Sequence, residues 1–223
     1  MHTGRGRRVL KTAAALAAVM ACGCASAATI EAEIDDAALP PEARAIDQVR
    51  TAAELAGWGR ARRDAGALIM AARLLAETPL RQSGDEPAFL TASALLDEAQ
   101  ALVGDNPNAL DAIQRLRDGG VRGVETSPFG RGPLFLVRQI GARDTYAFDV
   151  EARGGEVLRV AAIGDGDTDV DLAVRDAGGA LLCRDGFGDH YPVCTVAPRS
   201  SGKMRIDIIN RGDVWTRVQI LSN

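Results

Sequence analysis

The sequence predicts an α+β fold in two segregated parts: a helical bundle or set of helical hairpins, followed by an antiparallel β-sandwich of jelly-roll type. Between residues 40 and 118, apolar residues recur at intervals of three and four, the spacing of an amphipathic helix. Beyond residue 134 they alternate with polar residues, the spacing of a half-buried strand. Glycine-rich turns separate these short segments with no helical pattern between them, so antiparallel pairing is expected.

Capping and turn residues divide the helical module, residues 40–118, into four expected helices. Pro41 suits the first turn of the first helix, and Asp64 suits the N-cap of the second. A third helix is expected from about Glu86. Asn106-Pro107 combines an N-cap with a proline at the first position of the fourth. The short connections favour a small bundle or a solenoid fragment.

The glycine-rich residues 119–133 are expected to form a linker, and residues 134–223 to form the sandwich. Alternation of apolar and polar residues marks the strands of the sandwich. The expected strands lie at residues 146–150, 157–163, 170–174, 204–208 and 214–221.

Residues 1–27 have the organisation of an export signal peptide. Arg5 to Lys11 form a basic segment, and the apolar run at 12–21 is shorter than the ~20 residues that span a bilayer. Ala25-Ser26-Ala27 offers the small residues that a signal peptidase accepts. The alternative is a lipobox at residues 19–22, which would leave a lipoprotein anchored through Cys22. Both routes predict a periplasmic or secreted protein.

The charge of the chain argues against a nucleic-acid partner. Removal of residues 1–27 leaves 22 basic residues against 30 acidic ones, a net charge of −8. Nucleic acids and anionic lipids attract basic surfaces, so neither is an expected ligand. No segment after the signal peptide is apolar enough to predict a transmembrane span.

Cys183 and Cys194 are the two cysteines outside the targeting segment. In an oxidising compartment such a pair predicts a disulfide, which for a loop of this length stabilises the fold by about 3 kcal/mol. A metal site would need more ligands than His190 nearby, and a redox-active pair is more often spaced as Cys-x-x-Cys.

Several segments of residues 134–223 together resemble one known domain family. They are Tyr146-Ala147-Phe148 before a Gly-Gly turn, the run Asp169-Val170-Asp171-Leu172, the turn 176–179 and the segment 198–202. This pattern resembles the bacterial pre-peptidase C-terminal domain, and the chain end resembles a proteobacterial branch with the same cysteine pair. The resemblance implies a β-sandwich that accompanies secreted enzymes and serves binding or processing rather than chemistry.

The sequence contains no recognisable catalytic set. Outside the signal peptide His190 is the sole histidine, and there is no Gly-x-Ser-x-Gly nucleophile motif. Phosphate-binding loops and His/Cys zinc patterns are also missing from the sequence. We therefore expect a protein that is not an enzyme. The alternative is a hydrolase that uses acidic residues between the two modules.

The densest polar run in the chain is Asp165, Asp167, Asp169 and Asp171. Calcium takes six to eight oxygen ligands, often from alternating acids in a loop. The run resembles the first half of an EF-hand loop, although it lacks the central glycine and the final glutamate. The alternative is that these side chains accept hydrogen bonds from neighbouring backbone amides. Because nearby carboxylates repel one another without a cation, calcium is the one cofactor the sequence suggests.

A second candidate site is the loop enclosed by the two cysteines, which carries Phe187, His190 and Tyr191. A stapled loop with exposed aromatic side chains would be a preorganised recognition surface. The alternative is an ordinary hairpin end with one aromatic over the core. Together these observations predict an exported, non-catalytic interaction module for an envelope protein or glycan. A calcium-stabilised structural domain remains a further alternative.

Overall fold

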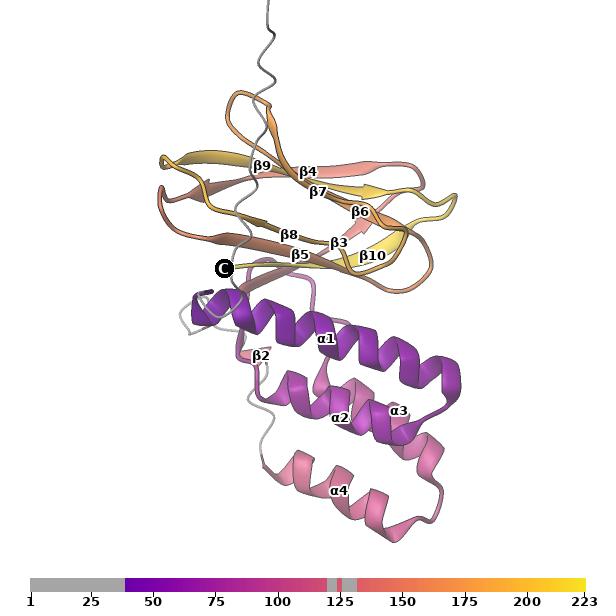
Figure 1. Ribbon diagram of the computed structural model, residues 1–223. Coiled ribbons are helices and arrows are strands. Elements are labelled where there is room, and N and C mark those ends of the chain that lie inside the picture. The colour runs from indigo at the N-terminus through magenta and orange to yellow at the C-terminus, as the bar shows by residue number, and fades with distance from the viewer. Residues whose placement is uncertain (1–38, 120–123, 126–131) are drawn as a thin grey trace, which may run out of the picture. The chain divides into compact units, whose positions relative to one another are not determined.

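A computed structural model describes residues 39–119, 124–125 and 132–223 (Figure 1). The expected signal peptide, the lipobox with Cys22 and most of the expected linker lie outside the described residues. Four helices and ten strands form within these residues. The helices are α1 (Pro41–Arg62), α2 (Ala65–Ala76), α3 (Ala92–Val103) and α4 (Pro107–Asp118). The strands are β1 (Leu80–Gln82), β2 (Val124–Glu125), β3 (Leu134–Ile140), β4 (Thr145–Ala152), β5 (Leu158–Gly164), β6 (Val170–Arg175), β7 (Leu181–Asp185), β8 (Val193–Val196), β9 (Gly202–Asn210) and β10 (Thr216–Ser222).

Side-chain caps set where three of the helices begin. The Asp64 carboxylate accepts from the Ala67 amide at 3.0 Å, and the Asn106 side chain accepts from the Ala109 amide at 3.3 Å, both as expected. The expected start of the third helix near Glu86 is wrong, because Thr91 accepts from the Ala94 amide and the helix begins at Ala92.

Strands β3 to β10 form a jelly roll. One sheet has the order β3-β10-β5-β8 and the other the order β4-β9-β6-β7, with antiparallel pairing throughout. The inner faces enclose a core that includes Leu172, Ile206 and Ile208. The expected fold class, helices followed by an antiparallel jelly-roll sandwich, is confirmed.

Two very short strands extend the first sheet in a way that the periodicity did not predict. β1 lies between α2 and α3 and pairs in parallel with β3, with Arg81 opposite Leu134. β2 falls within the expected linker and pairs in parallel with β1. The helical half therefore contributes backbone hydrogen bonds to the sheet of the sandwich.

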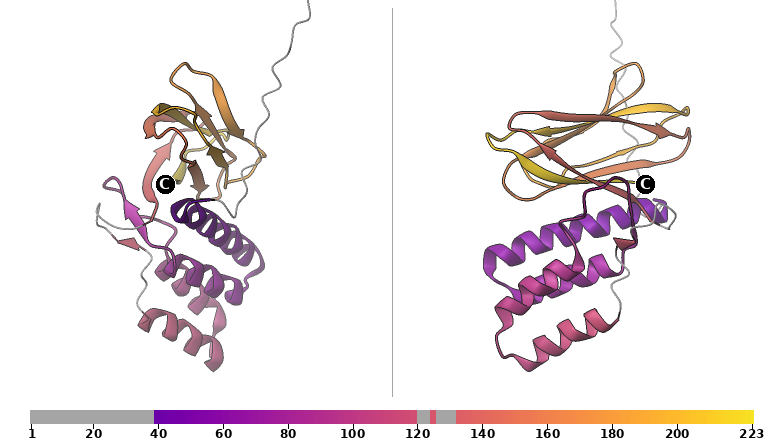
Figure 2. Two further views of the ribbon diagram at one scale, coloured as in Figure 1. Left: turned by 60° about the vertical axis from the view of Figure 1, so that its left-hand side comes forward. Right: turned by 180° about the vertical axis from the view of Figure 1, so that it is seen from behind.

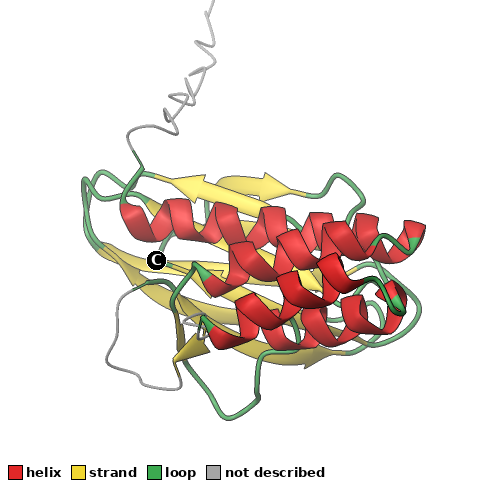
Figure 3. Cartoon of the chain, turned by 90° about the horizontal axis from the view of Figure 1, so that it is seen from below, coloured by secondary structure: helices red, strands yellow, loops and turns green. Residues whose placement is uncertain are grey.

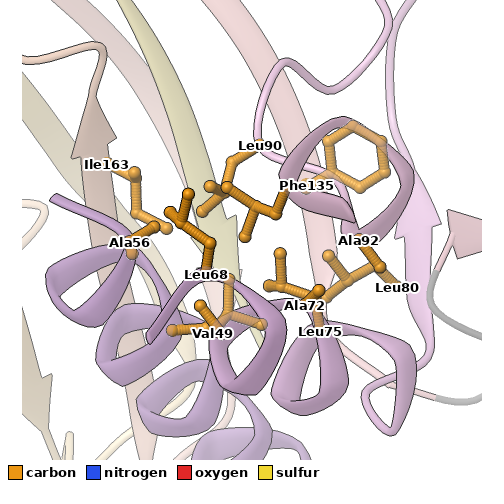
Figure 4. Packing of buried hydrophobic residues seen from close by; sticks show 14 of the residues in the cluster. Val49, Ala56, Leu68, Ala72, Leu75, Leu80, Leu90, Ala92, Phe135 and Ile163 are labelled. Atoms are coloured by element: carbon orange, nitrogen blue, oxygen red, sulfur yellow. The ribbon is translucent and has the colours of Figure 1, made fainter. Parts of the chain in front are cut away.

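Helix α1 lies against the outer face of the sheet that contains β5, and the other helices stack on the far side of α1 (Figures 2 and 3). Every residue of β5 is buried. Val160 and Ala162 pack into the sandwich core, whereas Ala161 and Ile163 pack against the helices. Figure 4 shows Ile163 of β5 at the side of the cluster where Ala56 lies, and Phe135 of β3 at the side where Leu90 and Ala92 lie. One hydrophobic cluster therefore joins the two halves of the chain.

Polar side chains are also buried in this helix–sheet layer. Arg159 on β5 forms an ion pair with Asp47 on α1. Gln219 on β10 is fully buried, and within the described part of the chain neither its amide nitrogen nor its amide oxygen has a hydrogen-bond partner. A buried polar group that has no partner costs about 1–3 kcal/mol. Among the residues described, no helix has the length and apolar character needed to cross a membrane.

Candidate functional site

Four connections gather at one end of the jelly roll, which we name the loop end. They are residues 141–144, 165–169, 186–192 and 211–215. Asn210 joins two of them, because its side-chain amide donates to the Gly141 carbonyl at 2.9 Å and to the Val214 carbonyl at 2.7 Å. The Arg211 amide donates to the Asp169 carbonyl at 2.9 Å, and the Val170 amide to the Asp189 carbonyl at 3.0 Å. Both candidate sites from the sequence lie at this end.

The four aspartates of the acidic run have different surroundings. Asp165 accepts from the Thr216 hydroxyl at 2.7 Å and from the Arg217 amide at 3.0 Å. Asp167 is exposed, and Asp169 has a buried carboxylate oxygen, Oδ1, with no hydrogen-bond partner among the described residues. Asp171 is buried on β6. The run therefore divides among a backbone-capping acid, a solvated acid and two acids at the base of the loops.

Arginines supply the positive charge next to Asp171. Its Oδ2 atom accepts from Arg184 Nη2 at 2.9 Å and from Arg211 Nε at 2.7 Å. This ion triad connects the strands that carry loops 186–192 and 211–215. Within the described segments, no group of three or more His, Cys, Asp or Glu side chains is arranged to hold a metal ion. Calcium binding by the acidic run stays a prediction.

The predicted disulfide between Cys183 and Cys194 is confirmed, with Cα atoms 5.8 Å apart. β7 is the last strand of one sheet and β8 is the last strand of the other. The bond therefore joins the two sheets at their open edges and closes the base of loop 186–192.

The three aromatic side chains of that loop have different positions. Phe187 is 93% exposed. The His190 ring nitrogen Nδ1 is in hydrogen-bond contact with the Thr168 carbonyl. Tyr191 is half-buried against α1, where a Cβ atom on Gly57 would lie 2.7 Å from the tyrosine hydroxyl. Of these three side chains, Phe187 is therefore the one that is exposed to solvent on nearly all sides.

Burial of Tyr191 changes its ionisation. Desolvation raises the pKa of the phenol above its usual value, and the nearby Arg60 guanidinium opposes this rise. Arg60 is itself held by Glu98 on α3, with Nε and Oε2 2.7 Å apart. Tyr191 therefore connects loop 186–192 to the helical layer.

Local hydrogen bonds and tight packing fix the remaining backbone of loop 186–192. Asp185 accepts from the Val193 amide at 2.9 Å, and Asp189 from the Tyr191 amide at 2.8 Å. A Cβ atom on Gly186 would lie 2.9 Å from the Asp171 carboxylate, so only glycine fits there. Gly188 has a φ of +82°, in the region that favours glycine. The loop presents Phe187 from a constrained backbone.

The sequence did not identify Val214 and Trp215 as part of this end. Both were expected in the last strand, but that strand begins at Thr216, because the Asn210 side chain accepts from the Gly212 amide at 2.9 Å and forms a turn. Val214 and Trp215 are about half exposed, at 52% and 51%. The segment Asn210-Arg211-Gly212-Asp213 was the turn signal that could have revealed them.

A polar pocket of about 340 Å³ lies at the opposite end, where β1 meets the sandwich. Its lining consists of Arg81, Glu151, Ala152, Arg153, Glu156, Val157, Leu158 and Asn223. Glu151 and Glu156 are exposed, and Glu156 forms an ion pair with Arg153 at 3.7 Å. The pocket brings two carboxylates together at the junction of the two halves, but it does not exclude water from them.

No protein-family model matches the sequence, and no curated protein matches it. Among solved structures, the chain is similar to the pre-peptidase C-terminal domain of a collagenase from Bacillus anthracis, with 6% identity over 40% of this chain and 87% of that one and a TM-score of 0.34. PliG, a periplasmic inhibitor of g-type lysozyme from Aeromonas hydrophila, has 18% identity over 41% and 84%, with a TM-score of 0.32. A carbohydrate-binding module of Cellvibrio mixtus lichenase 5A has 16% identity over 38% and 72%, with a TM-score of 0.27. These scores assign neither the pre-peptidase family nor any ligand, and the jelly roll is established by its strand order.

Proposed function

We propose that this chain is an exported, non-catalytic binding protein of the cell envelope, which recognises an envelope protein or glycan through its loop end. The observation that carries the proposal is Phe187, a large apolar side chain that is 93% exposed on a constrained loop. Exposing a phenylalanine to water forfeits about 1.5–3 kcal/mol of burial free energy, which a partner would recover.

Preorganisation supports this role. The Cys183–Cys194 disulfide, the Asp171 ion triad and the Tyr191 contact with α1 hold the loop before any partner arrives. A binding surface that is already ordered loses little conformational entropy on association, so affinity per contact is higher. The half-exposed Trp215 belongs to the same end and enlarges the apolar surface available to a partner.

The proposal is tested by Phe187→Ala in the oxidised protein. Binding is measured against purified peptidoglycan, envelope polysaccharides and soluble envelope proteins. Truncation of a central aromatic anchor should weaken binding by about tenfold or more. Met70→Ala, on the exposed face of α2, is the matched control because Met70 is 48% exposed and distant in sequence. Equal effects of the two substitutions, or no binding to any fraction, would remove the support for this surface.

The pocket with Glu151 and Glu156 favours a second candidate, a hydrolase at the junction of the two halves. Two carboxylates can act as acid and base on a glycosidic bond, but such chemistry needs a site that shields them from bulk water. If the chain is a binding protein, as proposed above, a screen of glycosidic and peptide substrates should detect no turnover. Turnover that disappears in Glu151→Gln would establish the hydrolase instead.

A further inference from the structure

We propose that the loop end docks a basic protein surface, one that presents several lysine or arginine side chains around an apolar centre. The inference rests on the proposed function, because it assumes that the loop end is the binding surface. It adds the chemical class of the partner, which the charge distribution and the exposed aromatics determine together.

The two ends of the sandwich differ sharply in charge. The four connections of the loop end contain six aspartates, two arginines and one histidine, an excess of four negative charges with the histidine neutral. Four of these aspartates, Asp144, Asp167, Asp189 and Asp213, are exposed. The opposite connections, residues 153–157, 176–180 and 197–201, contain two arginines and two acids and are neutral. The acidity of the sandwich connections is thus concentrated where the aromatics are exposed.

Four arginines near these loops have acidic partners, and a fifth, Arg217, lies over the Phe89 ring at 5.0 Å from its centroid. Arg184 and Arg211 form ion pairs with Asp171. Arg143 forms one with Asp213, with Nη2 and Oδ1 2.6 Å apart. Arg60, beside Tyr191, is bound to Glu98. None of the four paired arginines is therefore a spare counter-charge for Asp167 or Asp189. A partner that brings its own cations meets a complementary field, which speeds encounter and selects against acidic partners.

The exposed apolar side chains belong to the same loops as these aspartates. Phe187 belongs to loop 186–192, and Val214 and Trp215 belong to loop 211–215. The Arg184–Asp171–Arg211 triad ties the bases of these two loops together. Exposed aromatics surrounded by charged groups form the usual arrangement of a protein–protein binding centre with a polar rim.

Two polar side-chain atoms are buried in the loop that carries the exposed Asp167. Thr168 Oγ1 and Asp169 Oδ1 lie in loop 165–169 and have no hydrogen-bond partner among the described residues. Thr168 is 6% exposed. Because both atoms are buried, a docked partner does not reach them, and the choice of a basic partner rests on the exposed aspartates. Sugar hydroxyls can also donate to carboxylates, but a cationic partner gains in addition from the net negative charge, which repels an anionic glycan.

Cytochrome c, a basic protein, is the first probe, and succinylated cytochrome c, in which the lysines become acidic, is its matched control. Binding to the oxidised full chain is measured at low and moderate ionic strength. Asp167→Asn/Asp213→Asn should weaken binding to the native probe by about three- to tenfold at low salt, since surface charge pairs contribute modestly. Asp85→Asn/Asp105→Asn removes the same charge from exposed positions outside the loop end and should change binding less than about twofold. Binding should also fall as salt rises.

The outcomes separate this inference from the proposed function. Native cytochrome c bound in a salt-dependent manner, with the loop-end variant weaker than the control variant, supports the inference. Equal behaviour of the two charge variants, or equal binding of the succinylated probe, overturns it. If Phe187→Ala weakens binding to a glycan while cytochrome c does not bind, the loop end is a recognition surface but its partner is not basic. If added calcium abolishes cytochrome c binding at constant ionic strength, the aspartates form a calcium site, and this result also overturns the inference.

Discussion

The aromatic residues at positions 187 and 191 are four positions apart in one loop, yet they have opposite environments. Phe187 is surrounded by solvent, whereas Tyr191 packs against Gly57 of α1. The absence of a side chain at Gly57 is what allows the phenol ring to approach the helix. Either aromatic was an equally good candidate for recognition in the sequence, because a loop pattern does not reveal which side chain meets a neighbouring element.

The contact with α1 predicts an elevated pKa for Tyr191. The chain has two tyrosines, so Tyr146→Phe leaves Tyr191 as the sole phenol. Absorbance at 295 nm should then report ionisation above the usual value near 10 in the folded protein, and near that value in denaturant. Because the folded-state pKa is raised, the associated stability is fully present below pH 10 and is lost as pH rises through the folded pKa. A folded-state midpoint at or below 10 would contradict burial of the ring.

At the scale of the elements, β7 and β8 meet at the edge where the two sheets are open. The strands belong to different sheets and do not pair, so the disulfide supplies a covalent link between them beside loop 186–192 and the Asp185–Val193 hydrogen bond. The edge strand β7 also exposes Leu181, which is 50% accessible. An unpaired edge of this kind needs a constraint against opening and pairing with another chain.

Loss of the disulfide should therefore destabilise the sandwich. For the closed loop between Cys183 and Cys194, the chain-entropy model predicts a loss of about 3 kcal/mol in the free energy of unfolding. Urea unfolding of Cys183→Ala/Cys194→Ala is compared with the oxidised parent protein. The parent protein reduced with a thiol reagent is the third sample, because it loses the bond and keeps both cysteine side chains. Coincident unfolding curves for all three samples would show that the bond contributes nothing to stability.

At the scale of the whole described molecule, the helices and the sandwich share one hydrophobic cluster. Phe135 is 1% exposed and belongs to the sheet, but it packs on the helical side. Phe135→Ala should lower the free energy of unfolding by about 3–5 kcal/mol, the usual cost of such a cavity. The effect should extend to both halves, because each half buries its apolar face against the other.

The two tryptophans of the chain make this expectation measurable. Trp58 is on α1 and Trp215 is at the loop end. The single variant Trp215→Phe therefore retains a reporter in the helical half, and the single variant Trp58→Phe retains one in the sandwich. In a single cooperative unit the two fluorescence signals have the same midpoint, and Phe135→Ala lowers both equally. A shift confined to the Trp58 signal would mean that the helices unfold independently of the sandwich.

Much of the fold could be predicted from local pattern. The four helices followed from periodicity and from caps such as Asp64 and Asn106, and the central strands followed from alternation. β1 and β2 could not be predicted, because two or three residues carry no period and their pairing is with distant strands. The run Ala161-Ala162-Ile163 did carry a signal, since a continuous apolar strand is typical of burial on both faces.

The sequence by itself determined the fold class, the disulfide partners and the segment from which Phe187 projects, because these depend on periodicity, cysteine number and turn residues close together in the chain. Only the tertiary structure decided that Asp171 is neutralised by Arg184 and Arg211, that Tyr191 belongs to the helix contact and that Trp215 joins the loop end. Those outcomes depend on which elements become neighbours in space. That choice is made by burial of the shared hydrophobic cluster and by compensation of buried charge, both of which act between residues far apart in the sequence.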